Sequence, residues 1–178
     1  MATVRSIVIR AYRMAGIVPL SDEPEASELN AGVDVLQSIY DRVAANRDLT
    51  PVLKSGTYEA KEDERITGAT TVTLPTSVVD SVTGETRAPL DMAYVQYDTG
   101  SGFVTYASDR GSWVRTDALT ASSEAPFSDR NSEGLSALVA LEFAETYPGA
   151  TVGPMTVRKA RIFQSLFTRE PTIEPEYY

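Results

Sequence analysis

The chain of 178 residues contains no cysteine and no histidine. Without cysteine it can form neither a disulfide nor a thiolate metal site. Without histidine it lacks the commonest general base, the commonest transition-metal ligand and the usual partner of a nucleophilic serine or cysteine. Catalysis by a Ser-His or Cys-His pair is therefore excluded.

Long apolar runs and a surplus of basic residues are missing as well. No apolar run approaches the length of a membrane span, and the N-terminal MATVRSIVIRAYRMAG lacks the continuous apolar centre of a secretory signal. The net charge is -9, whereas a protein that grips phosphate backbones needs clustered Lys and Arg. We therefore expect no membrane segment and no tight binding to nucleic acid.

Two helices are predicted near the N-terminus. In residues 3–15 the apolar side chains recur every three or four residues and form one stripe, and Gly16 and Pro19 end the helix. Asp22 is expected to cap the next helix, with Glu25 three residues later as in a capping box. That helix carries a heptad-like seam of Ala26, Leu29, Val33, Leu36, Tyr40 and Val43. The seam needs a partner, so we expect an antiparallel helical hairpin inside a bundle rather than a free coiled coil.

A β segment follows these helices. Residues 57–117 are rich in Thr, Val, Tyr and Gly, and four stretches are typical of strands: TTVTLP (70–75), MAYVQY (92–97), FVTYA (103–107) and SWVRT (112–116). The turn sequences DTGSG and SDRG separate the last three. We expect a small antiparallel meander, with residues 76–88 as a long loop between strands.

Helical patterns return in the last third of the chain. Residues 135–147 are apolar on most sides, which predicts a helix at the centre of the bundle. Pro154 is expected to begin a last helix, and Pro171 to end it. The apolar face of this helix comprises Ala160, Phe163, Leu166 and Phe167.

Together these patterns predict one α+β domain over residues 1–178. It is expected to be mainly an α-helical bundle of four helices, built from residues 1–50 and 130–170. A small antiparallel β insertion with loops is expected in residues 51–129. Residues 171–178 are expected to form an extended C-terminal tail.

The search for catalytic chemistry finds little. P-loop, GxGxxG, HExxH and GxSxG patterns are absent. Asp98-Thr99-Gly100 matches the local signature of aspartic proteases, but it lies between two predicted strands where a turn is expected. The acidic runs 22–28 and 59–64 lack the EF-hand spacing, and we interpret them as charge at a helix N-terminus and as a solvated strand end or loop. We predict no catalytic residue, no cofactor, no metal site and no enzymatic activity.

Aromatic residues gather in the predicted sheet, at Tyr94, Tyr97, Tyr106 and Trp113. Any that point outward would suit a subunit interface. Half-exposed tyrosines on a sheet are also common in monomers, so both interpretations stay open.

Basic residues lie largely off the apolar face of the last helix, at Arg158, Lys159, Arg161 and Arg169. We interpret them as a solvated face, favoured by the preference of helix C-terminal ends for cations. A face that binds an acidic partner protein is the main alternative. A nucleic-acid patch is disfavoured, because no aromatic residues are interleaved with these charges and the chain is acidic.

The C-terminal PTIEPEYY is predicted to bind a partner through Pro171, Thr172, Ile173, Glu174, Pro175, Glu176, Tyr177 and Tyr178. The two prolines favour an extended backbone, the isoleucine and tyrosines supply apolar anchors, and the glutamates keep the segment soluble. Such a segment can dock in a groove or add a strand to another sheet. The alternative is a chain end that frays, as most do.

The arrangement resembles a known family. The residues that carry the resemblance are IVIRAYRMAGIVPLSDEPEASELNAGVDVLQSIYDRV (7–43) and GLSALVALEFAETYPGATVGPMTVRKARIFQSLF (134–167). The chain is similar to the head-to-tail adaptor, or connector, proteins of tailed bacteriophages, the group that includes the packaged-DNA stabilisation proteins of P22-like phages. The resemblance covers the two helical ends, and the β insertion agrees only in its place.

The resemblance implies a structural virion protein, not an enzyme. Such adaptors are assembled into the virion in the host cytoplasm. They form a twelve-fold ring under the portal protein at one capsid vertex. Their C-terminal tails reach portal subunits, and the ring extends the DNA channel and receives the next tail or neck protein. DNA passes through without sequence-specific binding, and an acidic ring would repel it.

Three other functions compete with this expectation. A tail-completion or terminator protein would also form a ring, but such proteins are usually richer in β structure. A cell-wall hydrolase would need two carboxylates facing one pocket. A small helical DNA-binding regulator is disfavoured by the charge balance.

Overall fold

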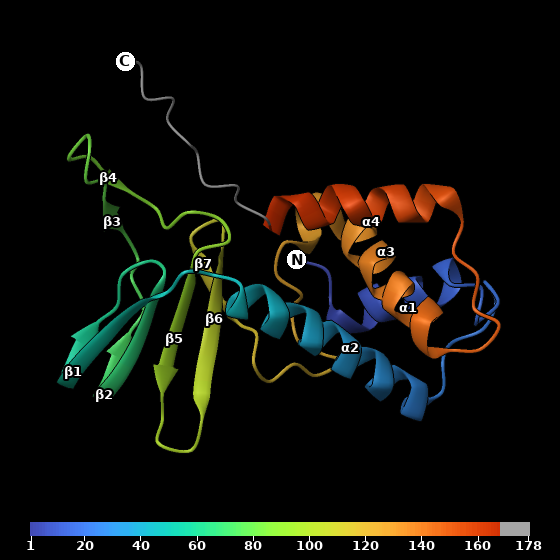
Figure 1. The fold of residues 1–178 in the computed structure, drawn as a ribbon, viewed down its shortest axis with the longest axis horizontal. Helices are drawn as coiled ribbons and strands as arrows, with labels where there is room; N and C mark the ends of the chain where they lie inside the picture. Colours follow the sequence, from blue (N-terminus) through green and yellow to red (C-terminus); the bar gives the residue numbers. More distant parts are fainter. Residues whose placement is uncertain (168–178) are drawn as a thin grey trace, which may run out of the picture.

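The computed structural model describes residues 1–167 and has two parts that lie side by side, a group of helices and a β-sheet (Figure 1). The helical part contains α1 (Val4–Met14), α2 (Ala26–Ala45), α3 (Ser128–Thr146) and α4 (Pro154–Phe167). The strands are β1 (Thr50–Glu59), β2 (Glu64–Thr73), β3 (Val78–Val79), β4 (Thr86–Arg87), β5 (Tyr94–Asp98), β6 (Phe103–Asp109) and β7 (Ser112–Arg115). The predicted helices are confirmed, with shifted ends.

The α1 helix buries its predicted apolar stripe, including Val4, Ile7, Val8 and Ala11. It also buries Tyr12. The Tyr12 ring stacks on Phe143, with 4.2 Å between ring centroids. Its hydroxyl donates to the Glu28 carbonyl at 2.8 Å and lies 2.9 Å from the Tyr147 hydroxyl. A tyrosine is therefore accommodated in this core because its polar end is satisfied.

The α2 helix begins three residues later than the predicted cap requires. Glu25 occupies the N-terminal cap, and its backbone N–H donates to the Glu28 carboxylate at 2.8 Å. The predicted Asp22 cap is wrong, because it would place Glu23 in the first helical position, directly before Pro24. A residue before proline avoids the helical conformation.

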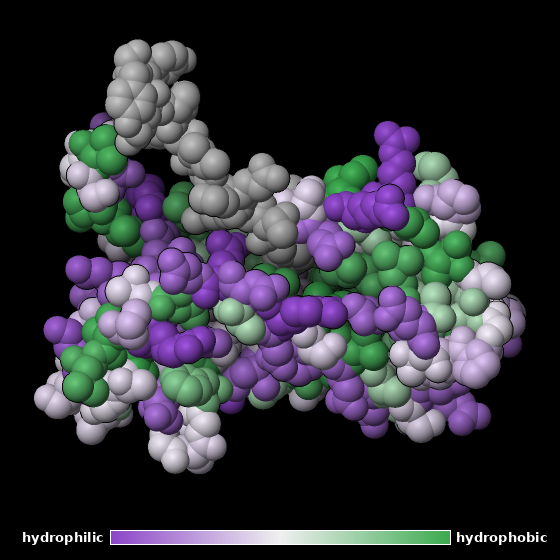
Figure 2. Space-filling view, in the orientation of Figure 1, coloured by the Kyte–Doolittle hydropathy of each residue, from purple (hydrophilic) through white to green (hydrophobic). Residues whose placement is uncertain are grey.

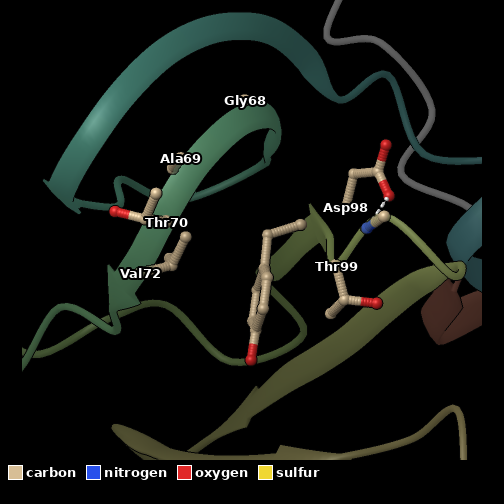
Figure 3. Close-up of a pocket in the computed structure, with 8 residues that line it drawn as sticks. Gly68, Ala69, Thr70, Val72, Asp98 and Thr99 are labelled. Atoms are coloured by element: carbon tan, nitrogen blue, oxygen red, sulfur yellow. Dashed lines mark hydrogen bonds between the residues drawn. The ribbon is translucent and has the colours of Figure 1, made fainter.

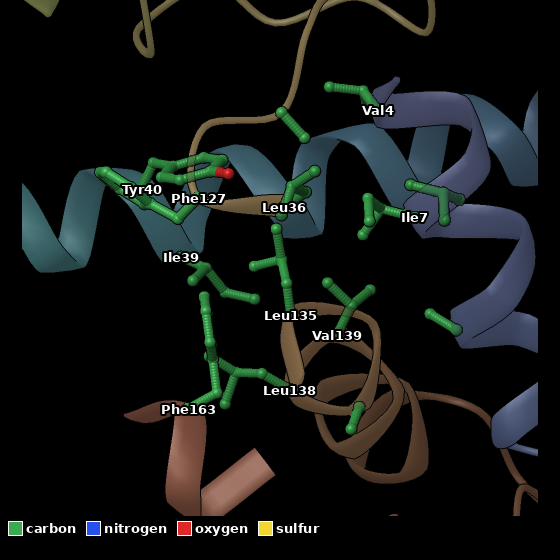
Figure 4. Close-up of a cluster of buried hydrophobic side chains, with 14 of the residues drawn as sticks. Val4, Ile7, Leu36, Ile39, Tyr40, Phe127, Leu135, Leu138, Val139 and Phe163 are labelled. Carbon is green, nitrogen blue, oxygen red and sulfur yellow. The ribbon is translucent and has the colours of Figure 1, made fainter. Parts of the chain in front are cut away.

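The α3 helix lies in the middle of the helical part. Every residue from Gly134 to Ala140 is buried. The α4 helix packs on one side of α3, and α2 lies on the opposite side (Figure 4). In that view, Leu36 of α2 lies above Leu135 of α3, and Phe163 of α4 lies beside Leu138. The prediction of residues 135–147 as the central helix is thus confirmed.

The main sheet has the strand order β1-β2-β5-β6-β7. Strands β5, β6 and β7 pair antiparallel, with Tyr94 opposite Ala107 and Tyr106 opposite Arg115. The predicted antiparallel meander is therefore confirmed for its last three strands only. However, β2 pairs parallel to both β1 and β5, so the sheet as a whole is mixed.

Strands β1 and β2 run parallel although only residues 60–63 connect them. Thr50 pairs with Glu64, and Glu59 pairs with Thr73. A straight strand of ten residues spans about 33 Å, whereas a four-residue connection reaches at most about 14 Å. Strand β1 must therefore bend back, so that the chain makes one coil before β2 begins.

Glycines make these bends possible. Gly56 in β1 has φ +78° and lies where the pairing register shifts, and Gly68 in β2 has φ +80°. A Cβ atom at Gly68 would also lie 2.7 Å from the Lys54 carbonyl oxygen. Other residues are disfavoured at both positions by the left-handed backbone.

The coiled strands enclose a second, smaller core beside the helical one. Ala60, Ile66 and Val95 are buried in it. Half-buried residues pack around them, namely Val52, Tyr58, Ala69, Val72, Leu74, Tyr97 and Trp113. The indole Nε1–H of Trp113 donates to the Pro75 carbonyl at 2.8 Å. The sheet therefore has an apolar interior of its own.

The predicted fold class, a mainly helical bundle with a small antiparallel insertion, is wrong. The described chain combines helices with a five-stranded mixed sheet that forms a separate part of the molecule. Residues 50–59 carry no strand signal, because Pro51, Lys54 and Gly56 interrupt apolar alternation and most of β1 is exposed. The predicted loop at residues 76–88 also contains the β3–β4 pair.

Candidate partner-binding surfaces

The basic residues predicted on the last helix lie in different environments. Arg158 and Arg161 are exposed on α4, and neither has an ion-pair partner within residues 1–167. Lys159 instead donates to Glu133 of α3 at 2.5 Å. Arg169 lies outside the described residues. Of the predicted basic face, Arg158 and Arg161 are the two described residues free to meet a partner.

The pair between Lys159 and Glu133 joins α4 to α3. The Lys159 ammonium lowers the pKa of Glu133. The pair is exposed, so it adds little stability. We therefore assign Lys159 to the contact between the two helices rather than to a partner.

Two large apolar side chains stand beside the free arginines on α4. Met155 is 64% exposed and Ile162 is 52% exposed. Both lie on the same side of the helix as Arg158, at spacings of three and four residues. Figure 2 shows hydrophilic purple and hydrophobic green residues together along α4, near the top of the view. This mixed basic and apolar face is unlike a purely solvated one.

The second exposed apolar feature is a projecting arm, residues 76–90, which contains β3 and β4. Val82 at its turn is 92% exposed, and Val79 is 65% exposed. The arm extends away from the main sheet (Figure 1), and green residues lie at its end in Figure 2. Two valines in this position suit contact with another molecule.

The base and turn of the arm are held by charged groups. Arg87 donates to both carboxylate oxygens of Glu62, at 3.0 and 2.7 Å, and its Nε lies 3.7 Å from Asp80. Asp80 accepts the backbone N–H groups of Val82 and Thr83 at 2.9 Å each. These N–H groups, Thr83 foremost, lower the pKa of Asp80. The arm is therefore ordered before any partner arrives.

Strand β1 forms one edge of the main sheet. It is exposed along most of its length, and Leu53 is 81% exposed. Pro51 lacks a backbone donor, Lys54 is charged and the bend at Gly56 turns the edge, and each of these discourages pairing with another strand. The edge is therefore a weaker candidate than the arm or α4.

An open hollow of about 480 Å³ lies between β2 and the β5–β6 turn (Figure 3). It is lined by Gly68, Ala69, Thr70, Val72, Tyr97, Asp98, Thr99 and Gly100. The Asp98 carboxylate accepts the Gly100 N–H at 2.7 Å, and the Thr99 N–H donates to the Gly102 carbonyl at 2.9 Å. The Asp-Thr-Gly triplet is thus a hairpin turn, as predicted.

Carboxylates elsewhere in the sheet region hold the backbone of distant segments. Asp63 accepts the Tyr94 N–H at 2.9 Å, Asp91 the Arg110 N–H at 2.6 Å, Asp109 the Phe127 N–H at 2.7 Å and Asp117 the Thr105 N–H at 3.0 Å. Glu64 is only 7% exposed and accepts the Lys61 N–H at 2.8 Å. The interpretation of run 59–64 as solvated is therefore wrong for Glu64, which has a structural role.

The aromatic residues of the sheet do not form an exposed face. Tyr94 is buried, while Tyr97, Tyr106 and Trp113 are half-buried. Tyr97 and Tyr106 stack with 6.3 Å between ring centroids. Their packing on the sheet corresponds to the alternative in which they need no partner.

Acidic side chains in residues 1–167 nowhere gather into a group of three or more that would hold a metal ion. Across the same residues, none of the helices has the length and apolar character needed to span a membrane. The predicted tail, Pro171 to Tyr178, lies outside the described residues.

No protein-family model matches the chain, and a search of curated proteins finds no significant match.

Two of these surfaces were missed by reasoning from sequence. The arm had a usable signal, because Asp80 and Gly84 flank a short segment, and aspartate and glycine both favour turns. Met155 and Ile162 fall seven residues apart on a helix and so share a side with Arg158. They were overlooked because the other face of α4 is the more strongly apolar one.

Proposed function

We propose that this protein is a structural component of a tailed-bacteriophage virion. In this proposal it is a head-to-tail adaptor that forms a ring under the portal, extends the DNA channel and joins capsid to tail. The resemblance of residues 7–43 and 134–167 to that family supports the proposal. It acts mechanically, without catalysis, cofactor or membrane, at the portal vertex of the virion after assembly in the host cytoplasm.

Among the features of the fold, the arm of residues 76–90 supports this function best. It presents Val79 and Val82 at the end of a hairpin that Glu62 and Asp80 already hold in place. An ordered apolar projection loses little conformational entropy when it binds. This is the chemistry of an assembly contact, in which one protein must fit between others.

The charge of the chain is compatible with a DNA channel. At -9 per copy, a ring of about twelve copies, the number in the family that it resembles, would be strongly acidic. Such a ring would repel duplex DNA and let it slide. A channel surface lined with Arg and Lys would contradict this part of the proposal.

A second candidate is a tail-completion or terminator protein. The five-stranded mixed sheet favours it, since such ring proteins are usually richer in β structure than the adaptors. The two candidates differ in partner, because an adaptor binds the portal and a terminator binds the tail tube.

The test is to mix the purified chain with portal rings and, separately, with tail tubes from the same virus. Three chains are compared: the full chain, the chain ending at residue 170, and Val79→Ser with Val82→Ser. We expect the full chain to cosediment with portal rings and each variant to bind at least about tenfold more weakly, since each loses apolar contacts worth more than about 1.4 kcal/mol. Full binding by the truncated chain would refute the role of residues 171–178. Binding to tail tubes alone would select the second candidate.

A further inference from the structure

The α4 helix carries an outward face that nothing covers within residues 1–167. The face comprises Met155, Arg158, Arg161 and Ile162, all exposed. The helix holds three basic residues and no acidic one, in a chain whose net charge is -9. Its large side chains protrude, so a close partner must offer space as well as negative charge.

The outward face of α2 offers both. Its exposed residues opposite the buried seam are Ser27, Asn30, Asp34, Ser38, Asp41 and Ala45. None of these has a side chain larger than aspartate, so the centre of the face is shallow. The exposed Arg42 lies at its edge, where it donates to Glu142 of α3. Asp41 accepts a hydrogen bond from Gln37 at 3.0 Å, and Asp34 has no ion-pair partner within residues 1–167. Both carboxylates therefore keep their charge available to a partner.

These two faces point away from each other. The α3 helix lies between α4 and α2 (Figures 1 and 4), so the outward side of each faces away from the shared core. One copy of the chain cannot bring them together. Two copies can, and the first copy then keeps its α2 face free while the second keeps its α4 face free.

We propose that α4 of one copy packs on α2 of a second copy. Met155 and Ile162 are seven residues apart, as are Asp34 and Asp41, which is about 10 Å along each helix. The small residues of α2 allow the helices to approach to the usual 8–10 Å or so. Arg158 and Arg161 then face Asp34 and Asp41, which fixes the register and discourages contact between two α4 faces.

A contact between unlike faces repeats from copy to copy. It produces a closed ring if the rotation between neighbours closes, and a filament if it does not. The inference rests on the proposed function in one respect, since a ring subunit needs a different surface on each side. The closing experiments use the purified chain alone, so they are independent of portal binding.

The first test uses charge reversal and mixing, read by sedimentation velocity. One variant carries Arg158→Glu and Arg161→Glu, and the other carries Asp34→Arg and Asp41→Arg. In each variant alone, α4 and α2 carry charges of the same sign and repel each other. We therefore expect each variant to self-associate at least about tenfold more weakly than the wild type. Mixed together, the two variants regain unlike charges at every contact and should associate again. Such recovery also demonstrates that both variants are folded.

Lys54→Glu with Lys61→Glu provides the matched control for the Arg158→Glu, Arg161→Glu variant, because it makes the same change in net charge on the sheet part. It should associate like the wild type. Equal association of all variants, or mixing without recovery, would overturn the proposed contact.

The second test exploits the absence of cysteine. Chains with Ser38→Cys and Ile162→Cys are mixed at high concentration and treated with a short bis-maleimide. We expect cross-linked dimers from the mixture of the two chains but few from either chain alone. A chain that carries both substitutions should give a ladder of cross-linked oligomers. Thr70→Cys, exposed on β2, replaces Ser38→Cys in the control mixture, which should give no dimer. An absent ladder, with portal binding intact, would overturn this contact while leaving the adaptor function standing.

Discussion

Gly32 sits where α1 crosses α2, and its missing side chain sets how closely the helices approach. A Cβ atom there would overlap the Val8 side chain and lie 3.3 Å from both Tyr12 and Phe143. Gly32→Ala gains about 1 kcal/mol of helix propensity, but overpacking costs about 1–3 kcal/mol. The overlap with Val8 places the cost near the upper end of that range, so we expect the variant to unfold about 2 kcal/mol more easily in urea.

Gly153→Ala serves as the matched control, because a Cβ atom there meets nothing within 4 Å. Because Gly153 caps α4, where alanine is disfavoured relative to glycine, the free energy of unfolding of this variant should fall by no more than about 1 kcal/mol. If Gly32→Ala is as stable as this control, the packing between α1 and α2 at their crossing can accommodate a methyl group, which would contradict the prediction.

Asp117 makes part of the stability of the sheet depend on pH. Partial burial raises its pKa, but the Arg115 guanidinium at 3.0 and 2.9 Å and the Thr105 N–H at 3.0 Å outweigh burial and hold the pKa below its usual range. A carboxyl whose pKa is lower in the folded state than the unfolded value of about 3.9 stabilises the fold above that value. This contribution is lost as the pH falls through the folded pKa.

We therefore expect Asp117→Asn to lower the free energy of unfolding at pH 7 by about 1–3 kcal/mol. The difference from the wild type should shrink as the pH falls below about 4 and through the lowered pKa of Asp117. Urea denaturation at a series of pH values measures it. A difference that stays constant with pH would indicate that the aspartate charge contributes nothing.

At the scale of elements, the arm depends on its anchor at Glu62. Glu62→Gln removes the charge that Arg87 binds at two points. Charged hydrogen bonds contribute about 1.5–3 kcal/mol, so we expect amides of the arm to exchange with solvent at least about tenfold faster. The informative amides are those of Asp80 and Gly84, which bond across the hairpin at 2.8 and 2.9 Å.

Hydrogen exchange read by mass spectrometry would detect this change. Glu59→Gln is the control, because Glu59 is exposed on β1 and has no ion-pair partner within the described chain. Unchanged exchange of the arm in Glu62→Gln would mean that the hairpin is ordered by its own turn alone.

The helices were predictable from the sequence, and half of the sheet was not. Apolar residues at three- and four-residue spacing defined α1 and α2, because a helix that buries one face must repeat in this way. Strand β1 buries almost nothing, so it shows no alternation. Its partner β2 binds it through backbone groups in a parallel register that depends on the bends at Gly56 and Gly68, and local sequence does not encode such pairing.

The candidate surfaces were predictable in part for a related reason. Arg158 and Arg161 were identified from charge alone, whereas Lys159 shared that charge but bonds to Glu133. Whether a basic side chain forms an ion pair within the fold depends on the residues of the helix that packs against it. The local sequence does not reveal this tertiary contact. The valines of the arm were missed because exposed apolar residues carry no periodicity.

At the scale of the molecule, the protein joins a helical part to a sheet part with separate apolar cores. In the proposed ring, the helices would make the contacts between copies through α4 and α2. The arm and residues 171–178 would then be left for other proteins. This division of surfaces is what an adaptor between two unlike partners requires.

The most direct test of the proposed adaptor function is a cryo-EM reconstruction of the portal vertex of the virion that, under this proposal, contains the chain. The account predicts a closed ring of this fold directly under the portal, with residues 171–178 resting on portal subunits. Density that places the chain at the far end of the tail, or a vertex that lacks it altogether, would contradict the account.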